Sequence, residues 1–248
     1  TWTVPAPTPP VLCSPTVMDA QPPPTPDIVF QGTSFAYNDI LASSVTPELR
    51  PEQGEAAIEA WNAPEHFFFT FNGYPLPDSF HTPRILIYPT DDYNAINPTA
   101  GDVIHQLKQL LQNQPPDPEE VPLLPIFNAA QFMQALVYYF RFQYGSGVLF
   151  LTQYGQAAWP INSDDMFYAY QGITDDGLYY VSVILPISHP NLPDPNSVTI
   201  DDAFYDNFMN YVDGMEDQLT TEPPDTFFPT LSVLDDMIKS LLVNGVNQ

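Results

Sequence analysis

Paired carboxylates are the first residues in this sequence whose type and spacing could do chemistry. Adjacent aspartates stand at expected loops and element starts, at Asp91-Asp92, Asp164-Asp165, Asp175-Asp176 and Asp201-Asp202. Calcium takes about six to eight oxygen ligands, and no Asp-x-Asp-x-Asp loop gathers them locally. Turn formation and helix capping explain the same pairs without a metal. We therefore predict no metal site and no cofactor, and keep calcium only as an addition to the carbohydrate alternative below.

Nucleophiles and general bases are the second possibility. The four histidines, His66, His81, His105 and His189, are scattered along the chain, and we expect them at separate surface or strand-end positions. No zinc-spaced Cys/His set and no phosphate-binding glycine loop is present. Gly145-Ser146-Gly147 fits a hairpin turn and lacks the strand-to-helix context of a serine hydrolase. We predict that the protein is not an enzyme and has no catalytic residues.

Two alternatives to a purely structural role remain open, and both concern sugars. Trp61, Trp159 and many tyrosines could stack on sugar rings, which favours a carbohydrate-binding surface module, with calcium assisting in one version. Asp and Glu are plentiful, so a glycoside hydrolase that uses two carboxylates is the second alternative. An abundance of carboxylates with no distinctive spacing between them is weak support for catalysis.

The charge of the chain excludes one large class of partners. Five Lys and Arg residues stand against thirty Asp and Glu, for a formal net charge of -25. Binding to nucleic acid needs cations that neutralise phosphates, and docking on an anionic membrane surface needs them too. No stretch approaches the roughly 20 apolar residues of a membrane span. We expect neither nucleic acid nor a direct membrane span.

The composition nevertheless predicts a packed protein. Only 14% of the residues are charged, whereas 44% are apolar and 14% aromatic. Disorder is typical of chains with far fewer apolar residues. With so few cations to form ion pairs, stability must come mainly from burial. We predict a single α+β domain over residues 27–248.

Residues 1–26 read differently, as a proline-rich extension. They carry nine prolines, a density that forbids helix and favours extended polyproline II structure. This segment is either a spacer or an arm that lies across a neighbouring subunit. Cys13, the only cysteine in the chain, lies within it and cannot form an intrachain disulfide.

The second half of the domain reads as an antiparallel meander. Residues 135–143 and 148–154 form one expected hairpin, joined by residues 144–147, and residues 166–172 and 178–187 form another around Asp176-Gly177. Large apolar residues point to both faces of these strands, so layers must cover both sides.

The rest of the domain is expected to alternate between strands and helices. Strands are predicted over residues 28–37, 66–71 and 84–88, and a turn of helix over 128–133. Helices are predicted over residues 52–61, 102–112, 199–219 and 231–243, the third of them capped by Thr199.

Several short motifs resemble a family of uncharacterised bacterial secreted or lipoprotein envelope domains. They are Phe127-Asn128-Ala129-Ala130-Gln131, Tyr144-Gly145-Ser146-Gly147, Leu151-Thr152-Gln153-Tyr154 and the run from Tyr170 to Ser182. The resemblance implies an envelope location and carries over no catalytic residues. The Phe35-Ala36-Tyr37 strand, antiparallel sheet and final helix also resemble, in architecture only, the PsbP-type domain.

These expectations combine into one predicted role. The protein is expected to be a non-catalytic structural or accessory subunit, extracellular or at the bacterial cell surface, that docks to other envelope proteins or to copies of itself. A glycan is the alternative partner. The residues expected to make contact lie in the arm and around the first hairpin; they are Trp2, Val11, Leu12, Cys13, Tyr138, Tyr139, Tyr144 and Tyr154.

Overall fold

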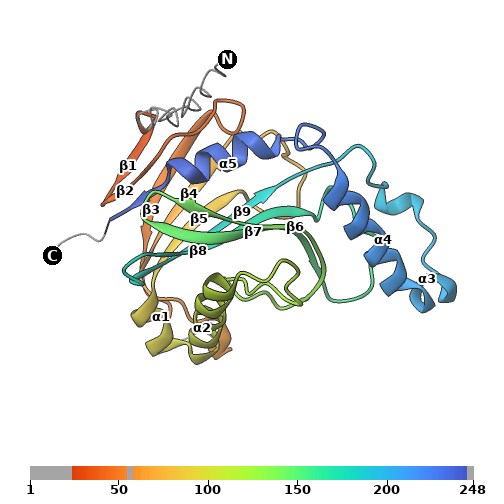
Figure 1. Cartoon of the computed structure of the whole chain (residues 1–248), viewed down its shortest axis with the longest axis horizontal. Helices are drawn as coiled ribbons and strands as arrows, with labels where there is room; N and C mark the ends of the chain where they lie inside the picture. The colour runs from red at the N-terminus through yellow and green to blue at the C-terminus, as the bar shows by residue number, and fades with distance from the viewer. Residues whose placement is uncertain (1–23, 55–57, 245–248) are drawn as a thin grey trace, which may run out of the picture.

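The computed structural model describes residues 24–54 and 58–244, which form a large antiparallel sheet with helices on both of its faces (Figure 1). The seven strands of this sheet follow the order β3-β4-β5-β9-β8-β7-β6, and a second sheet has the order β1-β2-β10. The expected α+β class and antiparallel meander are confirmed.

The strands are β1 (Ile28–Phe30), β2 (Thr33–Phe35), β3 (Ser44–Arg50), β4 (His66–Asn72), β5 (Arg84–Pro89), β6 (Ala130–Phe142), β7 (Gly145–Gly155), β8 (Phe167–Thr174), β9 (Tyr179–Pro186) and β10 (Leu242–Val243). The α-helices are α1 (Thr90–Ile96), α2 (Pro98–Asn113), α3 (Asp202–Asp206), α4 (Phe208–Thr221) and α5 (Leu231–Ser240), with short 3-10 turns η1 (Glu59–Trp61) and η2 (Pro195–Ser197).

The strand order follows from one long crossing. After β5 the chain runs through α1, α2 and the loop at residues 114–129 to the far edge of the sheet, where β6 begins. Strands β6, β7, β8 and β9 then step back until β9 pairs with β5. The crossing covers one face of the sheet, which we call the α2 face.

Each face of the sheet has its own hydrophobic layer, as the apolar residues on both sides of the strands predict. On the α2 face, Phe150 and Tyr180 are fully buried beneath α1, α2 and the long loop. On the other face, Leu151 and Tyr170 are fully buried beneath α5 and the small sheet. Figure 1 shows α1 and α2 on one side of the sheet and α5 on the other.

The long loop is held to the α2 face by a buried polar network. The backbone N–H of Leu124 and the hydroxyl of Tyr180 both donate to Oε1 of Gln171, at 3.1 and 2.6 Å. Gln171 in turn donates to Ser182, whose hydroxyl donates to the carbonyl of Leu124. Fully satisfied buried networks of this kind rigidify the segments that they join, and this one fixes the loop that carries Phe127.

The edge strand β6 is capped by side chains of α4. The backbone N–H of Gln134 donates to Oε1 of Glu216 at 2.6 Å, and that of Leu136 donates to Oγ1 of Thr220 at 3.2 Å. Leu136 has a φ of 55° at a break in the β6–β7 register. A bulge and edge N–H groups bonded to a helix both protect an edge from pairing with another strand.

Several boundaries in the first half differ from expectation. The strand expected over residues 28–37 is a hairpin, because Gln31 and Gly32 both adopt positive φ, at 44° and 80°, and turn the chain between β1 and β2. Strand β3 and helix α1 were not predicted, since β3 carries a proline and α1 is short. Of the expected helix at 52–61, the described residues show only the turn η1.

Further along, the expected helical turn at 128–133 is wrong, because β6 already begins at Ala130. The first hairpin turns at residues 143–144, so residues 145–147 belong to β7. Gly147 is needed for close packing, since a Cβ there would collide with the ring of Tyr170. Thr199 does not cap a helix; Asp201 caps α3 by accepting from the N–H of Phe204.

Candidate functional site

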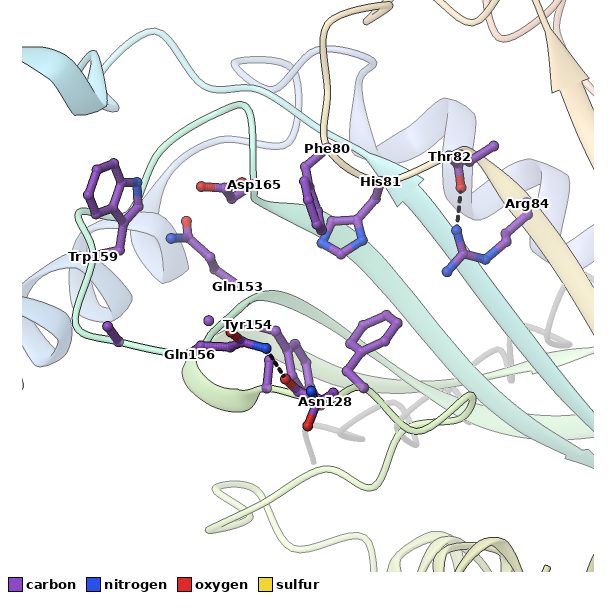
Figure 2. Close-up of a pocket in the computed structure, with 14 residues that line it drawn as sticks. Phe80, His81, Thr82, Arg84, Asn128, Gln153, Tyr154, Gln156, Trp159 and Asp165 are labelled. Atoms are coloured by element: carbon purple, nitrogen blue, oxygen red, sulfur yellow. Dashed lines mark hydrogen bonds between the residues drawn. The ribbon is translucent and has the colours of Figure 1, made fainter. Parts of the chain in front are cut away.

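The candidate site is an open pocket of about 750 Å³ at the end of the large sheet where β5 and β8 begin and β7 ends (Figure 2). Three separate segments line it. They are residues 80–84, residues 127–129, and the end of β7 with the loop that follows, from Gln153 to Asp165. A slightly larger groove lies beside α4. The pocket is the stronger candidate because its lining combines a histidine, an arginine and a carboxylate with exposed aromatic rings.

Aromatic rings form much of the pocket. His81 is 8% exposed and packs on Phe167 and Phe127, with ring centroids 4.4 and 5.5 Å apart. The ring of Tyr154 meets that of Phe127 edge-on at 5.0 Å. Phe80, at 77% exposed, stands at the mouth. These contacts fix the orientation of the imidazole by packing alone.

The imidazole of His81 differs from the other three in its hydrogen bonds. Those of His66, His105 and His189 each contact a polar partner at 2.8 to 3.0 Å. Among the described residues His81 has no such partner, and the only fully enclosed side-chain N or O atom that lacks one is Oγ1 of Thr33. Both ring nitrogens of His81 are therefore accessible, and in Figure 2 the ring points into the pocket.

The charge state of His81 follows from its surroundings. Burial, reinforced by the positive charge of Arg84, lowers the pKa of His81 from 6.5 to about 4. At neutral pH the ring is uncharged, with one nitrogen that donates and one that accepts. The pocket therefore contains a neutral imidazole that can make two hydrogen bonds to a ligand.

Arg84 is the only Lys or Arg among the described residues of the lining. It sits at the start of β5 on the α2 face and is partly buried, and its guanidinium donates to the carbonyl of Thr82 at 3.0 Å. Arg50, Arg141 and Lys239 each have a carboxylate within 4.0 Å, but no described carboxylate pairs with Arg84. Burial is the main cause that lowers the pKa of Arg84, so its charge is poorly solvated.

The wall of the pocket opposite His81 is the loop that follows β7, and the side-chain amides of Gln153 and Asn162 hold it in place. The Gln153 side chain donates to the carbonyl of Pro160 at 3.1 Å and accepts from the N–H of Asn162 at 3.0 Å. The Asn162 side chain donates to Oδ2 of Asp165 at 2.8 Å. Trp159, at 41% exposed, projects from this loop on the side of the pocket away from His81 (Figure 2).

Backbone and amide contacts tie the three segments together. The N–H of Phe80 donates to the carbonyl of Asp164 at 2.8 Å, which joins the first wall to the loop before β8. The side chain of Gln156 donates to the carbonyl of Asn128 at 2.9 Å, which joins the second wall to the same loop. The pocket is therefore preorganised, which lowers the entropic cost of binding a ligand.

Neither a metal-binding cluster nor a membrane-spanning helix is found among the described residues. No group of three or more His, Cys, Asp and Glu side chains lies close enough together to hold a metal ion. No helix in the described ranges combines the length and apolarity needed to cross a bilayer.

The residues predicted to make contacts lie in different environments in the structure. Tyr154 lines the pocket, and burial raises its pKa, so its hydroxyl stays protonated. Tyr138 donates to Asp235 at 2.8 Å, and Tyr139 donates to the carbonyl of Pro115 at 2.9 Å, so both hydroxyls bond within the protein. Tyr144 is 55% exposed at the tip of the first hairpin. The arm residues Trp2, Val11, Leu12 and Cys13 lie outside the described residues.

The sequence did not predict that the residues lining the pocket lie close together. Trp159 was considered as a residue that could stack on sugars, and Asp165 as one of a carboxylate pair, but His81 and Arg84 were not connected with either. The lining residues span positions 80 to 165, and no local motif links them. A Trp-Pro loop followed by Asp-Asp is the one signal that points to an ordered, polar loop here.

Comparison with known proteins adds no relative: no protein-family model, curated protein or solved structure matches this chain. The resemblance to bacterial envelope domains therefore stays a prediction from the sequence, as does the extracellular location that it implies.

Proposed function

We propose that this protein is a non-catalytic carbohydrate-binding protein of the cell surface or extracellular space, and that the pocket around His81 and Trp159 holds the sugar. The observation that carries the proposal is a preorganised pocket of about 750 Å³ in which an exposed indole faces hydrogen-bonding side chains. Sugars are bound by rings that stack on their apolar faces and by polar groups that bond their hydroxyls.

The lining matches this chemistry residue by residue. Trp159 and Phe80 present exposed aromatic surface at the mouth of the pocket. Asp165 supplies carboxylate oxygens that accept from sugar hydroxyls, and Asn128 and Gln156 supply amides. The neutral imidazole of His81 adds one donor and one acceptor.

The same lining supports a role without catalysis. Glycoside hydrolases generally use two carboxyl groups that flank the scissile bond, about 5 to 10 Å apart. Asp165 is the only carboxylate among the described residues of the pocket. Binding without bond cleavage is therefore the chemistry that this arrangement supports best.

A glycan array followed by titration calorimetry tests the proposal, with two variants that remove similar rings from different places. Trp159→Ala removes an indole that is 41% exposed in the pocket, and Trp61→Ala removes one that is 43% exposed on η1. Truncation of an aromatic side chain that carries a binding site costs more than about 1 kcal/mol, or at least about 5-fold in affinity. We expect that loss for Trp159→Ala and no change for Trp61→Ala. Equal losses, or no glycan bound at all, would contradict the proposal.

A second proposal comes from the groove beside α4, which has a volume of about 890 Å³. Met209 is 63% exposed at this groove, and Phe132 and Val103 also line it. Exposed apolar surface of this kind is typical of protein contacts. The protein would then be an accessory subunit that docks to envelope proteins or to copies of itself.

Native molecular mass tests this second proposal. A Met209→Glu variant places a charge in the groove and should shift an assembly to the monomer, whereas Leu178→Glu, at an exposed position in the β8–β9 turn, should not. Removal of residues 1–26 tests whether the arm contributes, because loss of assembly without unfolding is expected if it clasps a neighbour. An unchanged monomer in all samples would exclude self-assembly.

A further inference from the structure

Within the described part of the chain, the pocket contains a cation without a counter-ion and an imidazole without a hydrogen bond. Among the described residues, the Arg84 guanidinium has no carboxylate partner and the His81 imidazole has no hydrogen bond. Both lie on the same side of the pocket, at the start of β5 and in the segment just before it. Buried charges normally have a counter-ion and buried imidazoles a hydrogen bond, so the two exceptions that open on one cavity point to what the cavity holds.

We infer that the sugar bound in this pocket is an acidic one, a uronic acid whose carboxylate is held by the guanidinium of Arg84 and the ring N–H of His81. This inference rests on the carbohydrate-binding function proposed above. A carboxylate accepts two hydrogen bonds from a guanidinium in a planar fork, and such charge-assisted bonds are about twice as strong as neutral ones.

The net negative charge of the whole protein should confine the binding of an acidic ligand to the pocket that contains Arg84. A chain of net charge -25 repels anions at long range. An acidic ligand therefore needs a local cation, and Arg84 is the only Lys or Arg among the described residues of the lining. Its partial burial weakens competition from water and salt. The rest of the chain would disfavour acidic ligands elsewhere.

The other end of the pocket completes a fit to a sugar acid in particular. Asp165 lies on the opposite wall with Trp159 and would repel a second carboxylate, but it accepts from hydroxyl groups (Figure 2). A uronic acid carries a carboxylate at one position and hydroxyls around the remaining ring. The arrangement of one cation, one anion and exposed aromatic rings therefore matches a single acidic sugar unit better than a dianion.

The stability of an Arg84 variant provides an independent test of the same role. A poorly solvated guanidinium with no carboxylate beside it is unfavourable for folding, so removal of its charge should not destabilise the protein. If Arg84 were a structural residue, Arg84→Gln would lower the melting temperature. We expect an unchanged or higher melting temperature together with a loss of ligand, which is the pattern of a binding residue kept at the expense of stability.

The experiment compares methyl galacturonoside, a single uronic acid unit, with its methyl ester, which has nearly the same shape and no charge. Calorimetry is run on the full chain, on Arg84→Gln, and on Arg141→Gln as the matched control, because Arg141 pairs with the exposed Asp175 and does not line the pocket. Both variants lose one positive charge. We expect the acid to bind at least about 10-fold more tightly than the ester in the natural protein and in Arg141→Gln. In Arg84→Gln we expect equal affinity for the two.

An NMR titration of the imidazole provides a second readout that needs no variant. A carboxylate beside His81 favours its protonated form, so saturation with the acid should raise the pKa of His81 above about 4, whereas the ester should leave it unchanged.

Each outcome separates the two proposals. Equal binding of acid and ester, with both lost in Trp159→Ala, would overturn the acidic ligand and leave carbohydrate binding intact. Binding of neutral glycans alone would do the same. No saccharide bound by the natural protein would overturn both.

Discussion

Two buried histidines show how differently the fold treats the same side chain. His189, 3% exposed, has both ring nitrogens bonded: Nδ1 accepts from the N–H of Asn191 at 3.3 Å, and Nε2 contacts Oγ1 of Thr226 at 3.0 Å. Thr226 donates its own hydroxyl proton to Pro223, so Nε2 of His189 must be the donor. His81, 8% exposed, has aromatic neighbours and no bonded nitrogen.

The contrast separates a structural histidine from a binding one. The His189 ring joins the end of β9 to the segment before α5, and every polar group that it offers is used within the protein. The His81 ring is held by packing, which leaves both nitrogens for a ligand. Burial alone therefore does not identify a functional histidine; the absence of internal partners beside a cavity is what makes His81 the candidate.

The largest expected effect is the pH dependence that His81 gives to stability. Its pKa is about 4 in the folded protein, against 6.5 as the reference value. As the pH falls below 6.5 the unfolded chain takes up the proton first, so the free energy of unfolding decreases by about 3 kcal/mol by pH 4 and levels off about one pH unit below that. Urea unfolding of the natural protein and of His81→Phe at pH 7 and 4.5 isolates this effect. An equal decrease in the free energy of unfolding between pH 7 and 4.5 in the natural protein and in His81→Phe would contradict this prediction.

Substitution of the other histidine should have the next largest effect. His189→Phe removes the donor to Thr226 and leaves the N–H of Asn191 without its acceptor. We expect the free energy of unfolding to fall by about 2 kcal/mol at pH 7, measured by chemical denaturation. A loss much smaller than this would remove the contrast between the two histidines.

A smaller effect is expected in the frame of the pocket. Gln153→Met keeps the volume of the side chain but leaves the N–H of Asn162 without an acceptor. We expect a loss of about 1 to 2 kcal/mol, together with weaker ligand binding, because the loop that carries Trp159 loses an anchor. Hydrogen exchange of residues 156–162 should rise. Unchanged exchange would mean that Asn162 and Asp165 hold the loop unaided.

The smallest effect is expected at His81 at neutral pH. His81→Phe keeps the ring between Phe127 and Phe167 and removes no internal hydrogen bond. We expect thermal unfolding at pH 7 to change by less than about 1 kcal/mol. Titration calorimetry should show ligand binding weakened at the same time. A loss as large as that of His189→Phe would show that His81 is structural after all.

The class of fold and its main sheet could be predicted because strand signals are local. Alternating apolar residues and the Asp176-Gly177 turn indicate β8 and β9 directly, and the apolar stripe of residues 103–111 indicates α2. Strand β3 escaped prediction because Pro47 and Glu48 are unusual in strands, and an edge strand tolerates them since one side has no partner.

The pocket was beyond such reasoning for a physical reason. His81, Asn128 and Trp159 lie on segments separated by tens of residues, and their approach depends on a crossing from β5 to β6 that no local pattern encodes. Whether a histidine finds hydrogen-bond partners within the protein depends on the same long-range contacts.

Composition and periodicity determine the net charge of -25, the α+β class and the two-sided core, because charge is a sum over residues and strand patterns are local. The same charge leads us to expect no nucleic-acid partner. Tertiary structure decided which of the four histidines has no internal partner and that the cation lining the pocket, Arg84, has no described carboxylate beside it. Those properties arise from groups brought together across the fold, and they are the ones on which recognition of a ligand depends.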